Sequence, residues 1–197
     1  MVNDGLVLLL RHGEVEGGGR FRGGHDDPLT GQGWGQLRAA VAAETAAGRA
    51  NWDLIVCSPA ARCAAFARVL AAERGLPIHT LPAFRERGFG AWEGLRADQI
   101  PIDDLSRFWA DPLGFDPPGA EPFCAFRERV TAGWRHLLAG EACHPLLLTH
   151  GGVIRVILGQ VLGLAADALL LIEVPPACRT RLRVPIGEGR VSLIAHG

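Results

Sequence analysis

Three short runs of apolar residues stand out along the chain, at residues 7–10, 54–57 and 146–149. Nearly continuous apolar runs of this length are typical of central strands that are covered on both faces. Each run is followed at once by a turn and then by apolar residues at helical spacing. This alternation predicts an α/β fold with a mainly parallel sheet and helices on both of its faces.

Helical spacing recurs in four stretches, namely residues 36–47, the alanine-rich run after Pro59 up to Glu73, residues 123–138 and residues 153–162. Ser58 and Pro59 are expected to be the N-cap and the first residue of the alanine-rich helix. Near the C-terminus, residues 181–184 and 190–194 predict two strands that add an antiparallel edge to the sheet.

Residues 84–122 break this alternation, because their short helical pieces are interrupted by prolines. We interpret them as a small, largely helical flap inserted into one domain that spans residues 1–197. A chain of 197 residues can bury one substantial core, whereas two full domains would be cramped.

The charge of the chain is nearly balanced, with 20 basic and 21 acidic residues. This balance argues against nucleic-acid and membrane partners, so any anion must be held by a local cluster. The five cysteines form no Cys-x-x-Cys pair, which argues against a disulfide scaffold or a zinc site. The apolar stretches are too short to span a membrane, and we expect a reduced, cytoplasmic protein.

Basic side chains follow all three apolar runs, where each predicted strand ends. Arg11 and His12 come directly after the first run. Arg62 lies in the first helical turn after the second run, and His150 follows the third. Because the carboxyl ends of parallel strands meet at one edge of a sheet, we expect these side chains to converge. Donors that converge from several directions are what a phosphate group requires.

Neutral histidine is a competent nucleophile near pH 7, and arginine presents a planar fork of donors to phosphate oxygens. His12 beside Arg11 therefore indicates phosphoryl transfer through histidine. The helix start at Gly151 and Gly152 is expected to add backbone amides to the same pocket. Taken singly, each residue has a plainer explanation, and Arg62 alone would be interpreted as a solvated arginine.

The motifs that carry this chemistry resemble those of the histidine phosphatase superfamily, whose members include phosphoglycerate mutases and small phosphatases. They are Leu10-Arg11-His12-Gly13-Glu14, Phe21-x-Gly23, Asp27-Pro28-Leu29-Thr30, Ser58-Pro59-x-x-Arg62, Glu86-x-x-Phe89-Gly90-x-Trp92-Glu93-Gly94, Gly119-x-Glu121 and Thr149-His150-Gly151-Gly152-Val153. They run in family order over most of the chain. The resemblance implies a three-layer α/β/α sandwich and chemistry that needs neither a metal nor a cofactor.

The resemblance also implies catalytic roles. His12 would be the nucleophile, and Arg11, Arg62 and His150 would hold the phosphoryl group. Glu86 would protonate the leaving oxygen and then, as a carboxylate, take a proton from the attacking water.

Reasoning from the residues alone leaves the identity of the acid open. Glu93 and Glu14 compete with Glu86 for this role. Glu86 could also simply form an ion pair with Arg85 or Arg87.

The loop between residues 14 and 28 is the guide to the substrate. It resembles most closely the α-ribazole phosphatases of cobalamin synthesis, which implies α-ribazole 5′-phosphate or adenosylcobalamin 5′-phosphate as the substrate. Gly151, Arg22 and Gly23 are expected to contact the substrate. Arg20 or Arg22 is expected to replace a phosphate donor that relatives often have where this chain has Gly18.

Other functions remain open at this point. The runner-up is a broad-specificity phosphatase acting on sugar phosphates, phosphoglycerate or fructose bisphosphate. A mutase fits less well because the chain is short and its insertion compact, and a non-catalytic phosphoanion-binding protein is a further alternative. The expected partner is a small phosphorylated molecule, and a homodimer is left open. The flap residues that could contact an aromatic base are Phe108, Trp109, Phe115 and Phe123, although packing of the flap explains them more simply.

Overall fold

One sheet carries the residues that follow the apolar runs. In the computed structural model, which describes residues 4–111, 113–185, 187 and 189–197, six strands are found in the described part of the chain. In sheet order they are β3 (Ile78–Thr80), β2 (Leu54–Cys57), β4 (Pro145–Thr149), β1 (Gly5–Arg11), β5 (Arg179–Val184) and β6 (Ser192–His196). Neighbours from β3 to β1 are parallel, whereas β5 pairs antiparallel with β1 and β6 antiparallel with β5. The predicted parallel sheet with an antiparallel edge is confirmed.

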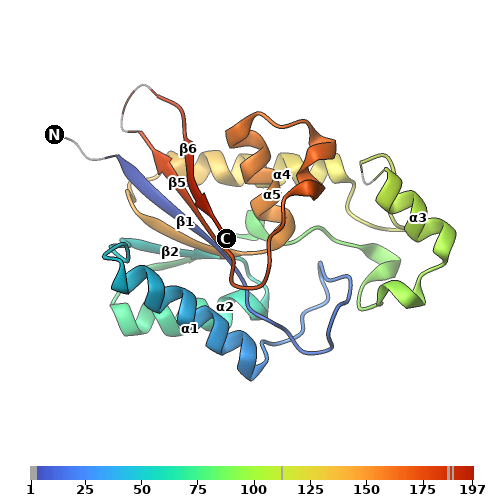
Figure 1. Ribbon diagram of the computed structural model, residues 1–197, viewed down its shortest axis with the longest axis horizontal. Helices are drawn as coiled ribbons and strands as arrows, with labels where there is room; N and C mark the ends of the chain where they lie inside the picture. The colour runs from blue at the N-terminus through green and yellow to red at the C-terminus, as the bar shows by residue number, and fades with distance from the viewer. Residues whose placement is uncertain (1–3, 112, 186, 188) are drawn as a thin grey trace.

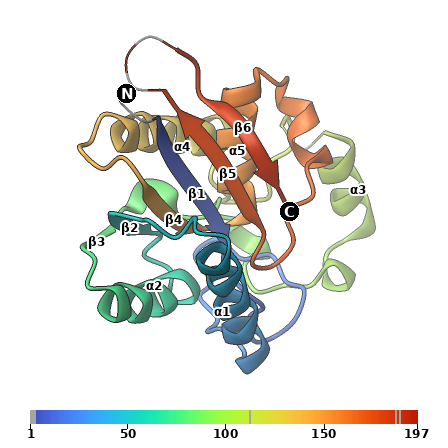
Figure 2. The ribbon, with the colours of Figure 1, turned by 60° about the vertical axis from the view of Figure 1, so that its left-hand side comes forward.

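Helices cover both faces of this sheet, as Figures 1 and 2 show. The first face is covered by α1 (Gly31–Ala46) and α2 (Ala61–Arg74). The other is covered by α4 (Phe123–Leu138) and α5 (Gly151–Leu162), with a short helix, η4 (Ala166–Leu171), packed on α5. The predicted three-layer α/β/α sandwich is confirmed.

The apolar run in β1 contributes side chains to the apolar cores on both faces of the sheet. Val7 and Leu9 pack into the core under α4 and α5, while Leu8 and Leu10 pack into the core under α1 and α2. Successive side chains of a strand point to opposite faces. A strand covered on both sides must therefore be apolar at every position, which is why the run does not alternate.

Two helix starts differ from the predicted ones. The helix predicted from residue 36 begins at Gly31, because the Thr30 side chain caps it by accepting a hydrogen bond from Gly33 N at 2.9 Å. The alanine-rich helix begins at Ala61, so the prediction of Ser58 as N-cap and Pro59 as first helical residue was wrong. The N-cap of that helix is Ala60, and the Ser58 hydroxyl lies 2.8 Å from the ring of a histidine in the site.

The segment 84–122 contains short helical pieces, as the sequence predicts. They are η1 (Pro82–Phe84), which begins just before it, η2 (Gly90–Trp92), η3 (Ala97–Gln99) and α3 (Ile102–Ala110). Trp92, Ile100 and Phe108 form a small apolar core of their own, against which Phe21 and Phe89 pack. Phe21 also exchanges backbone hydrogen bonds with this segment, since its N–H donates to Leu95 O and its carbonyl accepts from Gly94 N, both at 2.9 Å. The flap is thus joined to the loop that follows β1.

No helix in the described part of the chain is long and apolar enough to cross a membrane. The predicted turn between the last two strands, residues 185–189, lies partly outside the described residues, which omit 186 and 188.

Candidate active site

The carboxyl ends of β1 and β4 bring two of the predicted residues together. His12, directly after β1, donates its backbone N–H to Thr149 O at the end of β4, over 2.9 Å. The ring centroids of His12 and His150 are 5.3 Å apart in an edge-on arrangement. Both residues are buried, with 8% and 0% of their surface exposed. The sheet therefore positions these histidines through its backbone pairing.

Burial and hydrogen bonding keep the ring of His12 uncharged and oriented. Its Nδ1 lies 2.8 Å from Gly13 O, so this nitrogen carries the hydrogen and donates it. Nε2 is left with a free lone pair. Burial, reinforced by the charge of Arg11, lowers the pKa of His12 to about 3. His12 is consequently uncharged at neutral pH, as a nucleophile must be.

The ring of His150 is hydrogen-bonded to the Ser58 hydroxyl. The Ser58 hydroxyl oxygen accepts a hydrogen bond from Ala60 N at 3.3 Å and lies 2.8 Å from Nε2 of His150. When the Ser58 hydroxyl donates its one hydrogen to Nε2, the hydrogen of His150 lies on Nδ1, which has no partner among the described residues. Burial and the charge of Arg62 lower the pKa of His150 well below its usual value. Ser58 was expected only to cap a helix, and its position before Pro59 gave no sign of this contact.

Arg11 and Arg62 supply the positive charges of the site. Arg11 donates from Nη1 to Val174 O. Arg62 is 1% exposed and donates from Nη1 to His25 O at 3.0 Å and to Asp26 at 3.2 Å. Arg62 therefore lies within the structure behind the loop after β1, rather than on a solvated helix face.

Three buried nitrogen atoms have no hydrogen-bond acceptor among the described residues. They are Nε of Arg11, Nε of Arg62 and Nδ1 of His150. Buried donors are nearly always paired in folded proteins, because an unpaired donor costs on the order of 1–3 kcal/mol. Three such donors around His12 form an environment that suits the oxygens of an anion.

The carboxylate of Glu86 lies at the start of α5, near the guanidinium of Arg11. One carboxylate oxygen accepts a hydrogen bond from Gly152 N at 2.9 Å and the other from Arg87 N at 3.1 Å. Glu86 lines the same cavity of about 480 Å³ as Arg11 and His12. The amide of Gly152, which was expected to face the phosphate, is thus used to position this carboxylate. A Cβ at Gly152 would lie 2.2 Å from Glu86 Oε1, so only glycine leaves room for it.

The competing carboxylate of Glu93 has a structural task. It accepts hydrogen bonds from the backbone N–H groups of Gly23, Gly24, His25 and Phe89. Burial alone would raise its pKa, but these four donors outweigh it and leave the pKa of Glu93 lowered. A carboxylate so satisfied is a poor proton donor. Glu14 lines the cavity beside His12 and stays open as an alternative acid.

The loop residues expected to contact substrate are bonded mainly to their own loop. Arg22 donates to Asp27 and to the carbonyls of Glu16 and Gly18, each at 2.6 Å. The amide of Gly23 is bound to Glu93. The side chain of Arg22 still lines the cavity, and its role toward substrate, like that of Gly23 and Gly151, stays a prediction.

Arg20 is tied in the same way, because it donates to Gly17 O at 2.8 Å and to Gly94 O at 3.2 Å. The polar turn before Pro28 is also structural. Asp26 accepts from Ala61 N at 2.7 Å and so caps α2, while Asp27 pairs with Arg22. Within the described residues there is no cluster of three or more His, Cys, Asp or Glu that could hold a metal ion.

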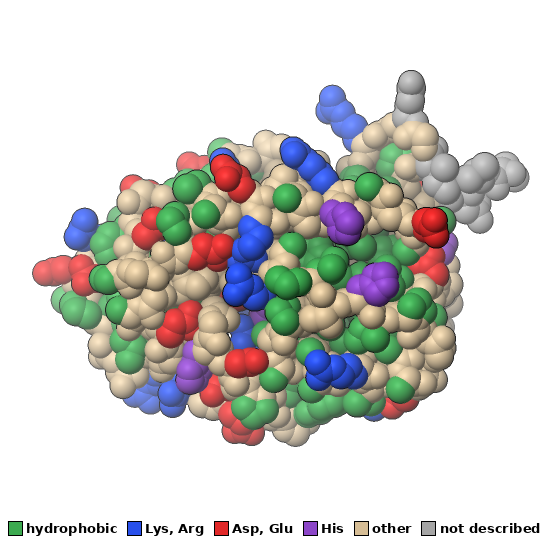
Figure 3. Space-filling view, turned by 180° about the vertical axis from the view of Figure 1, so that it is seen from behind, with side chains coloured by type: hydrophobic (Ala, Val, Ile, Leu, Met, Phe, Trp, Pro, Cys, Tyr) green, Lys and Arg blue, Asp and Glu red, His purple; other side chains and the backbone are tan. Residues whose placement is uncertain are grey.

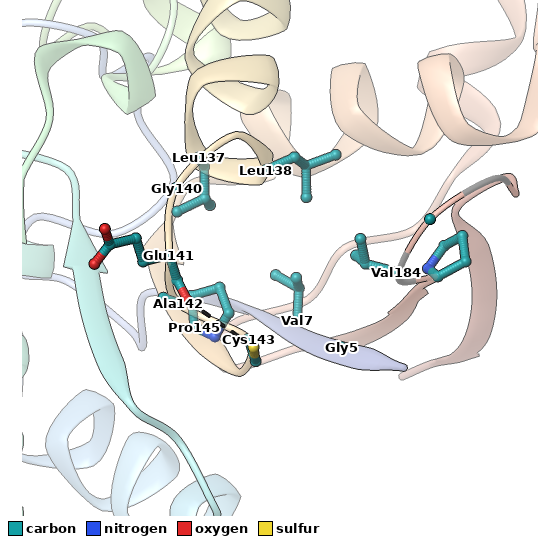
Figure 4. A pocket seen from close by; sticks show the side chains of 12 residues that line it. Gly5, Val7, Leu137, Leu138, Gly140, Glu141, Ala142, Cys143, Pro145 and Val184 are labelled. Carbon is teal, nitrogen blue, oxygen red and sulfur yellow. Dashed lines mark hydrogen bonds between the residues drawn. The ribbon is translucent and has the colours of Figure 1, made fainter. Parts of the chain in front are cut away.

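A second cavity, of about 250 Å³, lies at the opposite end of β1 (Figure 4). Gly5 and Val7 form its strand wall, and Leu137 and Leu138 face them from the end of α4. Its described lining includes neither histidine nor arginine. This cavity therefore lacks the groups that phosphate chemistry requires.

Figure 3 shows the face opposite to that in Figure 1, on which basic side chains form a narrow band near the middle with acidic side chains beside it. Charges of both signs are interspersed on this face, in keeping with the net charge of −1.

The arrangement of His12, Arg11, Arg62, His150 and Glu86 agrees with the protein family that the sequence matches. The model of the histidine phosphatase superfamily (branch 1) matches residues 7–196. The chain belongs to this superfamily. The predicted family and enzyme class, a phosphoric monoester hydrolase, are confirmed.

Individual proteins extend the similarity over nearly the whole chain. An adenosylcobalamin/α-ribazole phosphatase of Salmonella typhimurium is 32% identical over 193 residues, which cover 95% of this chain and 93% of that protein. The crystal structure of an α-ribazole phosphatase from Shigella flexneri superimposes with a TM-score of 0.82 at 26% identity, covering 95% and 94% of the two chains. A mycobacterial glucosyl-3-phosphoglycerate phosphatase also has a TM-score of 0.82 at 26% identity, covering 98% of each chain.

We expect Gly152→Ala to displace the Glu86 carboxylate, because the added Cβ would overlap it. Loss of a positioned acid should lower kcat roughly 100-fold on an alkyl phosphate, whose leaving oxygen needs a proton. Turnover of p-nitrophenyl phosphate, with its activated leaving group, should fall far less. Glu86→Gln should reproduce this pattern.

The matched control is Gly35→Ala in α1, where nothing lies within 4 Å of the added methyl group. This variant should keep wild-type rates on both substrates. Equal slowing of the two substrates by Gly152→Ala would contradict a positioned acid at Glu86.

The lowered pKa of His12 predicts that its ring does not titrate between about pH 5 and pH 8. Nitrogen chemical shifts of the ring should stay constant over that interval and show hydrogen on Nδ1 only. Long-range proton–nitrogen spectra measure both, with His12→Gln to assign the signal. A titration step in that interval would show that burial does not keep the ring neutral.

Proposed function

We propose that this protein hydrolyses phosphomonoesters through a phosphohistidine formed on His12. The lone pair of Nε2 attacks phosphorus while the bond to the leaving oxygen breaks. Glu86, as the acid, gives its proton to that oxygen, and the alcohol departs. Hydrogen bonding of Nδ1 to Gly13 O keeps the ring oriented throughout.

The second half-reaction returns the enzyme to its first state. The Glu86 carboxylate takes a proton from a water molecule whose oxygen attacks the phosphorus of phosphohistidine. The bond between nitrogen and phosphorus breaks, the electron pair returns to Nε2 and inorganic phosphate leaves. One carboxyl group thus serves both steps, as microscopic reversibility allows.

The observation that carries this mechanism is the set of three buried, unpaired donors around a neutral histidine. Arg11, Arg62 and His150 would share the negative charge on the phosphoryl oxygens, which is the main source of catalysis in phosphoryl transfer. All the groups in this mechanism belong to the chain itself, so it requires no metal and no cofactor.

The substrate that we propose is α-ribazole 5′-phosphate or adenosylcobalamin 5′-phosphate. The full-length similarity to the Salmonella and Shigella phosphatases supports this choice. The second candidate is a broad-specificity phosphatase for sugar phosphates, which the equally good superposition on glucosyl-3-phosphoglycerate phosphatase supports.

The proposal includes a cytoplasmic location and a small phosphorylated substrate as the partner, rather than nucleic acid or a membrane. The near-zero net charge supports a small-molecule partner over nucleic acid or a membrane. All five cysteines are free, which supports a reducing compartment. A homodimer stays a prediction.

His12→Ala should abolish phosphate release from p-nitrophenyl phosphate, whereas an excess of EDTA should leave the wild-type rate unchanged. Wild-type enzyme quenched in alkaline detergent should carry a phosphoryl group that is stable in base and lost on acidification, as phosphohistidine is. Rapid quench with a ³²P-labelled substrate detects it. Residual turnover in His12→Ala would exclude His12 as the nucleophile.

A panel of phosphomonoesters ranked by kcat/KM should place α-ribazole 5′-phosphate first, at least about 10-fold above 3-phosphoglycerate and fructose 1,6-bisphosphate. The reason is that specific binding of the leaving group contributes to transition-state stabilisation. Similar values for all members would favour the broad-specificity phosphatase instead.

A further inference from the structure

A third cavity, apolar and of about 120 Å³, adjoins the site on its Glu86 side. Glu86 and Phe89 line both this cavity and the one that contains His12. The two spaces therefore meet at the carboxylate that we propose as the acid. Because the acid must contact the leaving oxygen, whatever is bonded to that oxygen extends past Glu86 and away from His12.

The walls of this cavity are aromatic and aliphatic. Phe89 and Phe108 come from the flap, Phe123 from the start of α4, and Leu169 and Leu170 from η4. Phe108 and Leu169 are fixed in apolar cores, whereas Leu170 is 39% exposed at the surface. A space with a buried apolar floor and an exposed apolar rim suits a flat apolar ring entering from solvent.

The aromatic side chains of this cavity are held in position by a neighbouring arginine. The buried guanidinium of Arg87 lies 6.0 Å from the ring centroid of Phe89 and 5.7 Å from that of Phe123. Arg87 is itself held by Asp116 and by Glu121 O. A ligand ring would therefore meet ordered walls, which lowers the entropy cost of binding.

Arg155 forms the polar edge of the same cavity. It lines the cavity, and its Nε donates to Ile172 O at 2.9 Å. A Cβ at Gly151 would lie 3.5 Å from Arg155 Nη1 and 3.7 Å from Arg11 Nε, so the two arginines flank the start of α5. Among the described residues no acceptor is bound to the Nη atoms of Arg155. They are placed to donate to oxygen atoms of a ligand between the phosphate and the ring.

We infer that this cavity is the leaving-group subsite, and that it selects phosphomonoesters whose alcohol carries a flat apolar ring beyond a polar, hydroxylated linker. Phe89, Phe123 and Leu170 contact the ring, and Arg155 binds the linker. The inference rests on the proposed phosphatase function and deepens it. It gives a physical reason for selecting a base-bearing ribosyl phosphate over a plain sugar phosphate, because only the former has a ring to bury.

The test compares α-ribazole 5′-phosphate with ribose 5-phosphate, which share the ribosyl phosphate and differ in the base. Wild-type enzyme should prefer the former at least about 10-fold in kcat/KM. Ala166→Trp places a large side chain in the cavity wall and should reduce that preference to about 1. Phe123→Ala, which removes one wall, should reduce it in part.

The matched control is Ala165→Trp, an exposed position next to the cavity residue that does not line the cavity. It should keep the wild-type preference. Arg155→Gln should lower kcat/KM for both substrates by a similar factor of roughly 10, because both contain the linker. A preference that survives both Ala166→Trp and Phe123→Ala would overturn the inference.

A second substrate pair separates this inference from the proposed substrate. Phenylethyl phosphate and ethyl phosphate have similarly poor leaving groups and differ in the ring. If wild-type enzyme prefers phenylethyl phosphate and Ala166→Trp removes that preference, the subsite is supported even if α-ribazole 5′-phosphate is a poor substrate. In that outcome the α-ribazole assignment fails and the leaving-group subsite does not.

Discussion

The burial of two arginine charges beside a histidine is the constraint on which the rest of the site depends. A guanidinium removed from water is costly unless acceptors surround it. Val174 O serves Arg11, and the loop carbonyl of His25 together with Asp26 serves Arg62. The two histidines stay neutral and so add no further positive charge. What remains unpaired is a small set of donors, and a phosphoryl group supplies the acceptors that they lack.

The loop after β1 and the flap depend on each other. Glu93 of the flap holds the amides of Gly23, Gly24 and His25, and Phe21 of the loop packs into the apolar core of the flap. The carbonyls that face Arg62 come from this same loop. The position of the loop, and with it the environment of Arg62, is therefore set from a segment more than 60 residues further along the chain.

The sequence was sufficient for the parts of the molecule that follow from local physical rules. A strand buried on both faces must be apolar throughout, so the runs around Leu9 and Leu147 predicted the sheet, and its direction placed His12 and His150 at one edge. Ser58 could not be assigned in the same way, because its contact with His150 joins residues 92 positions apart. The choice between Glu86 and Glu93 likewise depended on which backbone amides each carboxylate meets, and these come from distant segments.

The flap has a consequence for how the specificity of such a protein can change. Its core of Trp92, Ile100 and Phe108 is separate from the two cores that sandwich the sheet. Substitutions there alter the walls beside Glu86 while His12 and Arg62 stay anchored to the sheet and to α2. The nucleophile is thus carried by the sheet, whereas the walls beside Glu86 belong to a part whose apolar core is separate from those of the sheet. Changes confined to that separate core can therefore reshape the space for the leaving alcohol without disturbing the packing that holds the nucleophile in place.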